Sequence, residues 1–202
     1  MEVVCVSTSD SRAYYSIMTR LRNTNLKSAS VTPGEAARKE CSLIITTNAE
    51  LGLFKGQAIA IEELDDNSLI MEGQILSRMH DRRNRTILIG IDPGSRIGLA
   101  VYYGDDQLAG LTFNSLDNLR GFIVKMVKVI PNSGAVIKIG DGSPELCKLI
   151  ADMMINTVPP VRIEIVDEKG TSLGKPGSGG LTRDQSAAAR IALRRGVEYR
   201  IH

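Results

Sequence analysis

Four carboxylates in the second half of this 202-residue chain stand where a sheet protein could gather them into one site. Asp92 and Asp141 each follow an apolar run typical of a β-strand, Asp167 and Glu168 together follow a third such run, and Asp184 lies in the first turn of a predicted helix. Carboxylate oxygens are the ligands that Mg²⁺ and Mn²⁺ prefer. Two such ions about 3.5–4 Å apart can hold both the attacking and the leaving oxygen of a phosphodiester displacement. One carboxylate from each of these four places is therefore a candidate metal ligand and catalytic residue: Asp92, Asp141, either Asp167 or Glu168, and Asp184.

The pattern of elements over residues 86–202 predicts how these carboxylates would meet. Three short-linked strands must run antiparallel, and two crossover units then add two more strands, in the order βββαβαβα. Right-handed crossovers make the first, fourth and fifth strands parallel neighbours, with their carboxyl ends together. Functional clefts of open α/β sheets form at such ends. We therefore expect a mixed sheet with a cleft at one edge. The predicted strands are 86–91, 97–103, 108–113, 135–139 and 161–166, and the predicted helices are 115–130, 143–155 and 182–195.

The last predicted helix places a carboxylate on its apolar side. Thr182 and Gln185 have the spacing of a capping box. Asp184 then shares a face with Ala188 and Ile191, which must pack on the sheet. A charge on that face is unfavourable unless something compensates it, and a divalent cation would do so.

The first half predicts a separate small α/β domain over residues 1–77, whose role the sequence does not indicate. Strands are expected at residues 3–6, 27–31 and 42–46, with a hairpin formed by 57–63 and 68–73. We find neither a glycine-rich phosphate loop nor a nucleophile paired with a base there. The basic stretch 78–85, RMHDRRNR, is expected to be an exposed linker or the end of a short connecting helix.

Composition excludes several classes of protein. A net charge of +2 excludes a polybasic tail and a highly acidic disordered chain. Aromatic residues make up only 4%, which argues against a protein that binds single strands by serial stacking. The three cysteines have no metal-ligand spacing and are expected to be buried thiols. Without a secretory segment or a long apolar run, we expect a soluble cytoplasmic protein that makes no contact with membranes.

Three sequence blocks resemble the signature motifs of the YqgF/RuvC-like Holliday-junction resolvase group, within the RNase H-like nuclease superfamily. The resemblance covers residues 86–196, and the blocks are IGIDPGSRIGLA at 89–100, VDEKGTS at 166–172 and DQSAAARIAL at 184–193. It implies an RNase H-like domain that cleaves structured nucleic acid with Mg²⁺ or Mn²⁺. It also implies that Asp92, Glu168 and Asp184 form the acidic triad, with Glu168 rather than Asp167 as the acid after the fifth strand. Asp141 matches the position where the RuvC branch has its strand-four acid.

Candidate phosphate contacts are Arg96, Lys169, Lys175 and Arg183. The loop after Glu168 is less basic than in that group, and the first 85 residues match nothing in it, so branched DNA and structured RNA both remain candidate substrates. A symmetric homodimer is expected for a resolvase that acts on two strands.

Two alternatives stay open. One is a non-catalytic RNase H-like module that binds nucleic acid or protein. The other is a fragment of a sugar-kinase or actin-like ATPase.

Overall fold

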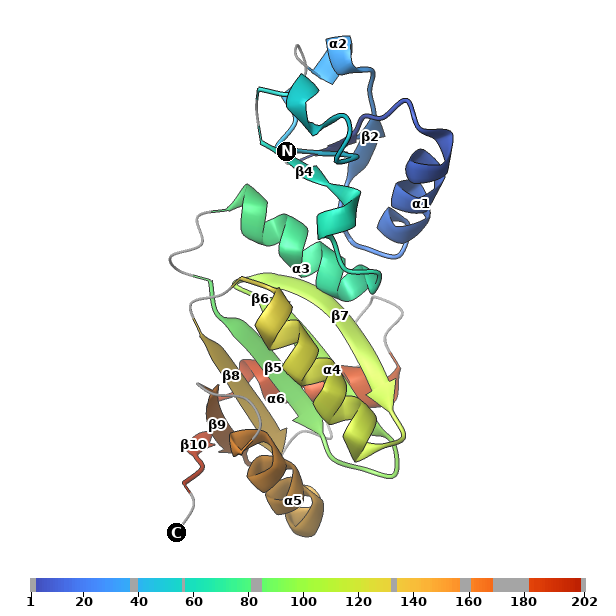
Figure 1. Cartoon of the computed structure of the whole chain (residues 1–202). Helices are drawn as coiled ribbons and strands as arrows, with labels where there is room; N and C mark the ends of the chain where they lie inside the picture. The colour runs from blue at the N-terminus through green and yellow to red at the C-terminus, as the bar shows by residue number, and fades with distance from the viewer. Residues whose placement is uncertain are drawn as a thin grey trace. The chain divides into compact units, whose positions relative to one another are not determined.

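The computed structural model describes residues 3–36, 40–55, 57–80, 85–131, 134–156, 161–168 and 182–200 (Figure 1). The chain divides into two compact units, Met1–Arg82 and Arg83–His202. Within the described ranges, no helix combines the length and the apolar character that a membrane span requires. Both units are α/β, so the predicted fold class is confirmed at that level.

The first unit contains a four-stranded parallel sheet in the order β2-β1-β3-β4. Its core includes Val4, Val6, Ile17, Ile45 and Ile75. The strands at the start of the unit lie where the sequence predicted them. The elements of the unit are β1 Val4–Val6, α1 Ser11–Leu21, β2 Ser28–Ser30, α2 Pro33–Ala36, β3 Leu43–Thr46, β4 Ala58–Ala60 and α3 Ser68–Met79, with short 3₁₀ turns at Leu51–Leu53 and Ile61–Glu63.

The predicted hairpin in this unit is wrong in its second half. Residues 68–73 begin the helix α3 instead of forming a strand. The side chain of Asn67, which lies between the two segments of the predicted hairpin, caps the helix by accepting hydrogen bonds from the backbone N–H groups of Leu69 and Ile70. Because α3 continues to Met79, the start of the predicted 78–85 linker is helical, and Arg78 pairs with Glu63 at 3.2 Å.

The cysteine prediction also needs a correction. Cys5 and Cys41 form a disulfide with a Cα–Cα distance of 5.7 Å, whereas we expected both to be free thiols. Cys5 lies in β1, and Cys41 lies two residues before the neighbouring parallel strand β3. The pairing of these strands brings the two sulfurs together. A separation of 36 residues in the sequence does not by itself predict that contact. Cys147 is a buried free thiol, as expected.

The second unit contains a six-stranded sheet in the order β10-β9-β8-β5-β6-β7. Strands β5, β8 and β9 are parallel neighbours, and β6 pairs antiparallel with both β5 and β7, which confirms the predicted neighbours. The short edge strand β10 was not predicted. The elements are β5 Ile87–Asp92, β6 Ile97–Tyr103, β7 Asp106–Phe113, α4 Leu116–Val129, β8 Ala135–Gly140, α5 Pro144–Ile155, β9 Val161–Val166, α6 Arg183–Leu193 and β10 Val197–Glu198.

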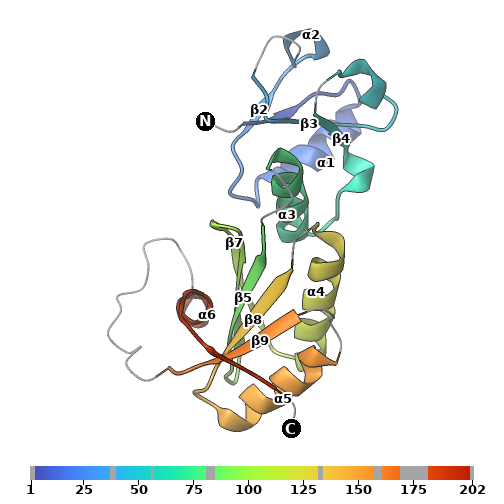
Figure 2. The ribbon, with the colours of Figure 1, turned by 90° about the vertical axis from the view of Figure 1, so that its left-hand side faces the viewer.

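Helix α6 covers one face of this sheet, and α4 and α5 cover the other (Figure 2). Two glycines allow α6 to lie directly on the strands. A Cβ at Gly90 would overlap the carbonyl oxygen of Ala188 and lie 2.7 Å from the backbone nitrogen of Ala192. A Cβ at Gly98 would lie 2.6 Å from the carbonyl carbon of Asp184. The first turn of α6 therefore lies against the start of β6, where Gly98 pairs with Asp92 at the end of β5.

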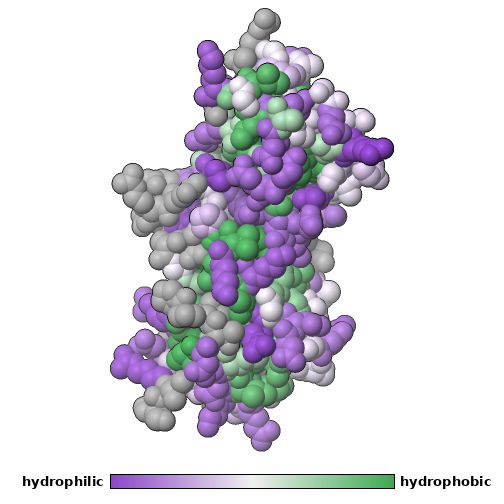
Figure 3. All heavy atoms as spheres, viewed as in Figure 1, coloured by the Kyte–Doolittle hydropathy of each residue, from purple (hydrophilic) through white to green (hydrophobic). Residues whose placement is uncertain are grey.

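The visible surface is mainly hydrophilic, and hydrophobic residues occur on it in separate patches (Figure 3). The large hydrophobic side chains that are most exposed belong to different elements: Tyr15 to α1, Leu53 to a 3₁₀ turn, Leu193 to α6 and Val197 to β10. The homodimer stays a prediction.

Candidate functional site

Three of the predicted carboxylates interact electrostatically at one end of the second sheet. Asp92 is the last residue of β5, Glu168 follows β9 by two residues, and Asp184 lies in the first turn of α6. Burial raises the pKa of Asp92 to about 6, and the negative charges of Glu168 and Asp184 contribute to the increase. Segments far apart in the chain therefore bring these three side chains near one another.

Asp184 is fixed by the way α6 begins. Thr182 and Gln185 form the predicted capping box, and the Gln185 side chain also donates a hydrogen bond of 2.9 Å to the carbonyl of Gly110 in β7. The Oδ2 atom of Asp184 is buried and has no hydrogen-bond partner among the described residues. The Nη2 atom of Arg96 lies 3.1 Å from it, an ion pair that does not meet the geometry of a hydrogen bond. The cation beside this oxygen of Asp184 is therefore the guanidinium group of Arg96.

Glu168 is held over the end of β8. Its Oε1 atom accepts a hydrogen bond of 3.0 Å from the backbone N–H of Gly142. Gly140 leaves room for this carboxylate, because a Cβ there would overlap Oε1. A glycine at position 140 thus fits the observed position of Glu168.

Asp141 is joined to Glu168 through the backbone. Its Oδ1 atom accepts a hydrogen bond of 2.9 Å from the N–H of Glu168, and its own N–H donates to the carbonyl of Val166 at 3.1 Å. These two bonds tie the ends of β8 and β9 together. The structure therefore gives Asp141 a positioning role that the sequence did not indicate.

The predicted phosphate contacts have different surroundings. Arg96 pairs with Asp184, and Arg183 is exposed at the start of α6, near enough to lower the pKa of Asp92. Lys169 and Lys175 lie outside the described residues.

Sequence reasoning missed Arg190, which also lowers the pKa of Asp92. Its Nε atom is buried without a hydrogen-bond partner in the described part of the chain. The sequence could have indicated Arg190 by its spacing, because it lies seven residues after Arg183 and therefore on the same side of the helix.

No group of three or more Asp, Glu, His or Cys side chains is arranged to hold a metal ion among the described residues. Two features nevertheless fit a divalent cation. The Oδ2 atom of Asp184 is buried without a hydrogen bond to any described residue, and the repulsion that helps raise the pKa of Asp92 would be relieved by a positive charge.

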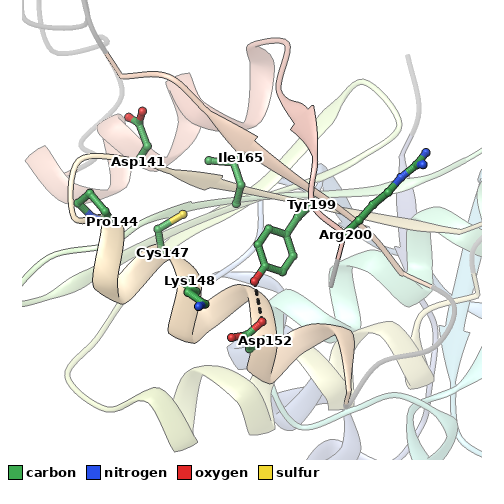
Figure 4. A pocket seen from close by; sticks show the side chains of 8 residues that line it. All are labelled: Asp141, Pro144, Cys147, Lys148, Asp152, Ile165, Tyr199 and Arg200. Atoms are coloured by element: carbon green, nitrogen blue, oxygen red, sulfur yellow. Dashed lines mark hydrogen bonds between the residues drawn. The ribbon is translucent and has the colours of Figure 1, made fainter. Parts of the chain in front are cut away.

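A cavity of about 530 Å³ lies beside the site, between α5, the end of β9 and the segment after β10 (Figure 4). The Tyr199 hydroxyl donates a hydrogen bond of 2.7 Å to Asp152 inside it, while the carboxylate of Asp141 points away from the Tyr199 ring. Burial raises the pKa of the Cys147 thiol to about 11, with smaller contributions from Asp141 and Glu168. Burial therefore favours the protonated form of the Cys147 thiol at neutral pH.

Neither the protein-family models nor the curated proteins include a match to this chain. Among solved structures, the chain is similar to Marinitoga piezophila Argonaute, crystallised in complex with a 5′ OH guide RNA and target DNA. The identity is 10% and the TM-score is 0.31, over 82% of this chain. The chain spans 39% of the length of that Argonaute chain. A similarity this low does not support an assignment of fold or function.

Proposed function

We propose that the second unit is a metal-dependent nuclease of the RNase H-like superfamily, which hydrolyses phosphodiester bonds in Holliday-junction-like DNA or structured RNA. The observation that carries this proposal is the electrostatic interaction of Asp92, Glu168 and Asp184 at the carboxyl end of β5 and β9. The order β9-β8-β5-β6-β7, in which β6 alone runs opposite to the other four strands, supports it. The three motif blocks that resemble the YqgF/RuvC-like group include these same residues.

In this proposal Asp92, Glu168 and Asp184 hold Mg²⁺ or Mn²⁺. Ions held there would supply positive charge for the attacking and leaving oxygens of the displacement. Asp141 keeps the backbone of Glu168 in place, and Arg183 and Arg190 offset part of the negative charge around Asp92. Because Arg96 is paired with Asp184, its guanidinium has to move from Oδ2 before that atom can act as a ligand.

The test is cleavage of a labelled four-way DNA junction and of a structured RNA, each with Mg²⁺, Mn²⁺ or EDTA. We expect metal-dependent cleavage by the natural chain, and a loss of about 100-fold or more in Asp92→Asn, because the ions supply several kcal/mol of transition-state stabilisation. Asp105→Asn, an exposed turn residue between β6 and β7, is the matched control and should cleave normally. Equal cleavage by Asp92→Asn would show that the nuclease assignment is wrong.

A non-catalytic nucleic-acid-binding module is the second candidate. It is favoured by the Arg96–Asp184 ion pair, which places a cation of the chain itself beside one carboxylate. In that case the protein would bind the junction or the RNA in EDTA and leave both intact at every metal concentration. Cleavage that depends on Asp92 would exclude it.

A further inference from the structure

We propose that one side of α6 binds the phosphodiester backbone of a nucleic-acid strand through Arg183, Arg190 and Arg194, which we call the α6 arginine stripe. The inference rests on the proposed function, which puts the scissile bond at the three carboxylates. It adds the contacts that hold the strand next to those carboxylates. Arg190 and Arg194 had no predicted role in the sequence.

The spacing of the three residues puts them on one side of the helix. Arg190 follows Arg183 by seven residues, and Arg194, the C-cap residue, follows Arg190 by four. At 3.6 residues per turn, these steps return to nearly the same direction. A rise of about 1.5 Å per residue places Arg183 and Arg194 about 16 Å apart along the axis.

Two hydrogen bonds show which way this side faces. The side chain of Gln185 contacts Gly110 in β7, and Gln185 lies almost opposite the stripe around the helix. The Nη1 atom of Arg194 donates a hydrogen bond of 3.2 Å to the carbonyl of Asp167, the residue before Glu168. The stripe therefore faces the end of β9, on the sheet face that α6 covers (Figure 2).

The stripe also has donors to offer. Arg183 is exposed, and the Nε atom of Arg190 is buried without a hydrogen-bond partner among the described residues. The positive charges of both guanidinium groups lower the pKa of Asp92, so both groups lie near the proposed reaction site. Guanidinium groups bind phosphate oxygens with two parallel hydrogen bonds; Arg183 is exposed for such contacts, whereas the Nε atom of Arg190 has to become exposed before it can donate to a phosphate.

The length of the stripe favours a strand over a free phosphate ion. A single phosphate could reach the neighbouring Arg190 and Arg194 but could not span the whole stripe, whereas about 16 Å corresponds to about five nucleotides at 3.4 Å of rise each. One end of the stripe adjoins Asp184, so a strand lying along it leads to the carboxylates. Contacts to phosphates carry no sequence information, and binding should therefore be independent of base sequence.

The experiment measures binding by the full chain in EDTA, where metal-dependent cleavage is excluded. Fluorescence anisotropy with a labelled four-way DNA junction, a labelled 20-nucleotide DNA strand and a labelled RNA hairpin gives Kd between 50 and 200 mM KCl. Arg183→Gln and Arg190→Gln are each expected to weaken binding about tenfold. Each should also reduce the slope of log K against log salt by about 0.7–0.9, the value for one phosphate contact. Arg120→Gln makes the same charge change at an exposed position on α4, across the sheet, and should have little effect.

The alternative is that the arginines only balance the nearby carboxylates. The stripe variants would then bind with unchanged Kd and salt slope, and Arg190→Gln would only unfold at a lower temperature; this result would overturn the proposal. Arg183→Gln keeps the test valid if Arg190→Gln fails to fold, because Arg183 is exposed. Stripe-dependent binding without cleavage under any metal would support the stripe and reject the nuclease. Cleavage together with unchanged binding by the variants would reject the stripe alone.

Discussion

Replacing Asp92 with asparagine should make the metal-free protein more stable at neutral pH. The folded-state pKa of Asp92 is about 6, compared with 3.8 for an unperturbed aspartate, because the carboxylate is partly buried beside two other acids. The folded protein therefore binds this proton more tightly than the unfolded chain does. The corresponding stabilisation is complete below about pH 4 and is lost as the pH rises through about 6. Asp92→Asn has no charge to develop and should not show this loss.

The structure sets the size of the effect. A pKa difference of about 2 corresponds to about 3 kcal/mol at 1.36 kcal/mol for each pH unit. Asp92 is only partly buried, so solvent screening reduces the expected gain at pH 7.5 to about 1–2 kcal/mol. For a chain of this size, the melting temperature should rise by roughly 2–8 °C.

Thermal unfolding between pH 4 and 7.5, at low salt in EDTA, measures this gain. Adding Mn²⁺ should stabilise the natural chain by binding only to its folded form, and should stabilise Asp92→Asn much less. Asp105→Asn removes the same charge from an exposed turn and should follow the natural chain throughout. If Asp92→Asn were no more stable than the natural chain at pH 7.5 in EDTA, the carboxylates would not repel one another, and the argument for a shared site would fail.

Two further predictions concern packing and the disulfide. Gly98→Ala should lower the free energy of unfolding, measured in urea, by about 1–3 kcal/mol, since its Cβ would collide with the backbone of Asp184. Gly121→Ala, in open space within α4, should instead raise the free energy of unfolding by about 0.5–1 kcal/mol. A change of the same sign in both variants would contradict the close approach of α6. Reduction of the Cys5–Cys41 bond should lower the stability of the first unit by about 4 kcal/mol, from the 36-residue separation of the cysteines. Dithiothreitol should have no such effect on Cys41→Ser, and an equal loss in that variant would point to another cause.

The sequence predicted the second unit well because its signals were local and agreed with one another. Short turns fixed the antiparallel strands, and crossover helices fixed the parallel ones. The capping box at Thr182 and Gln185 located the start of α6. In the first unit the signals at residues 67–73 conflicted. Asn67 is favoured both in turns and at helix N-caps, and the apolar run that follows it fits a strand or a buried helix equally well.

The site could be predicted only in outline. The ends of parallel strands identified Asp92 and Glu168 as neighbours, and the apolar face of α6 brought in Asp184. The bond from the Glu168 N–H to Asp141 and the ion pair between Arg96 and Asp184 depend on the exact course of loops, which the pattern of residue types does not specify. Arg190 was missed because a basic residue in a helix is usually a solvated surface charge.

Strand alternation connects the glycines of this sheet with its carboxylates. Gly90 and Asp92 are two residues apart in β5, so both point to the face that α6 covers. Gly98 lies opposite Asp92 in β6, and a side chain at Gly98 would push the first turn of α6 away from the sheet. At the end of β8, Gly140 leaves the space that Glu168 enters from β9. A larger residue at either of these last two positions would move one acid of the site while leaving the strand order intact. The absence of side chains at Gly98 and Gly140 therefore helps to determine where Asp184 and Glu168 lie relative to Asp92.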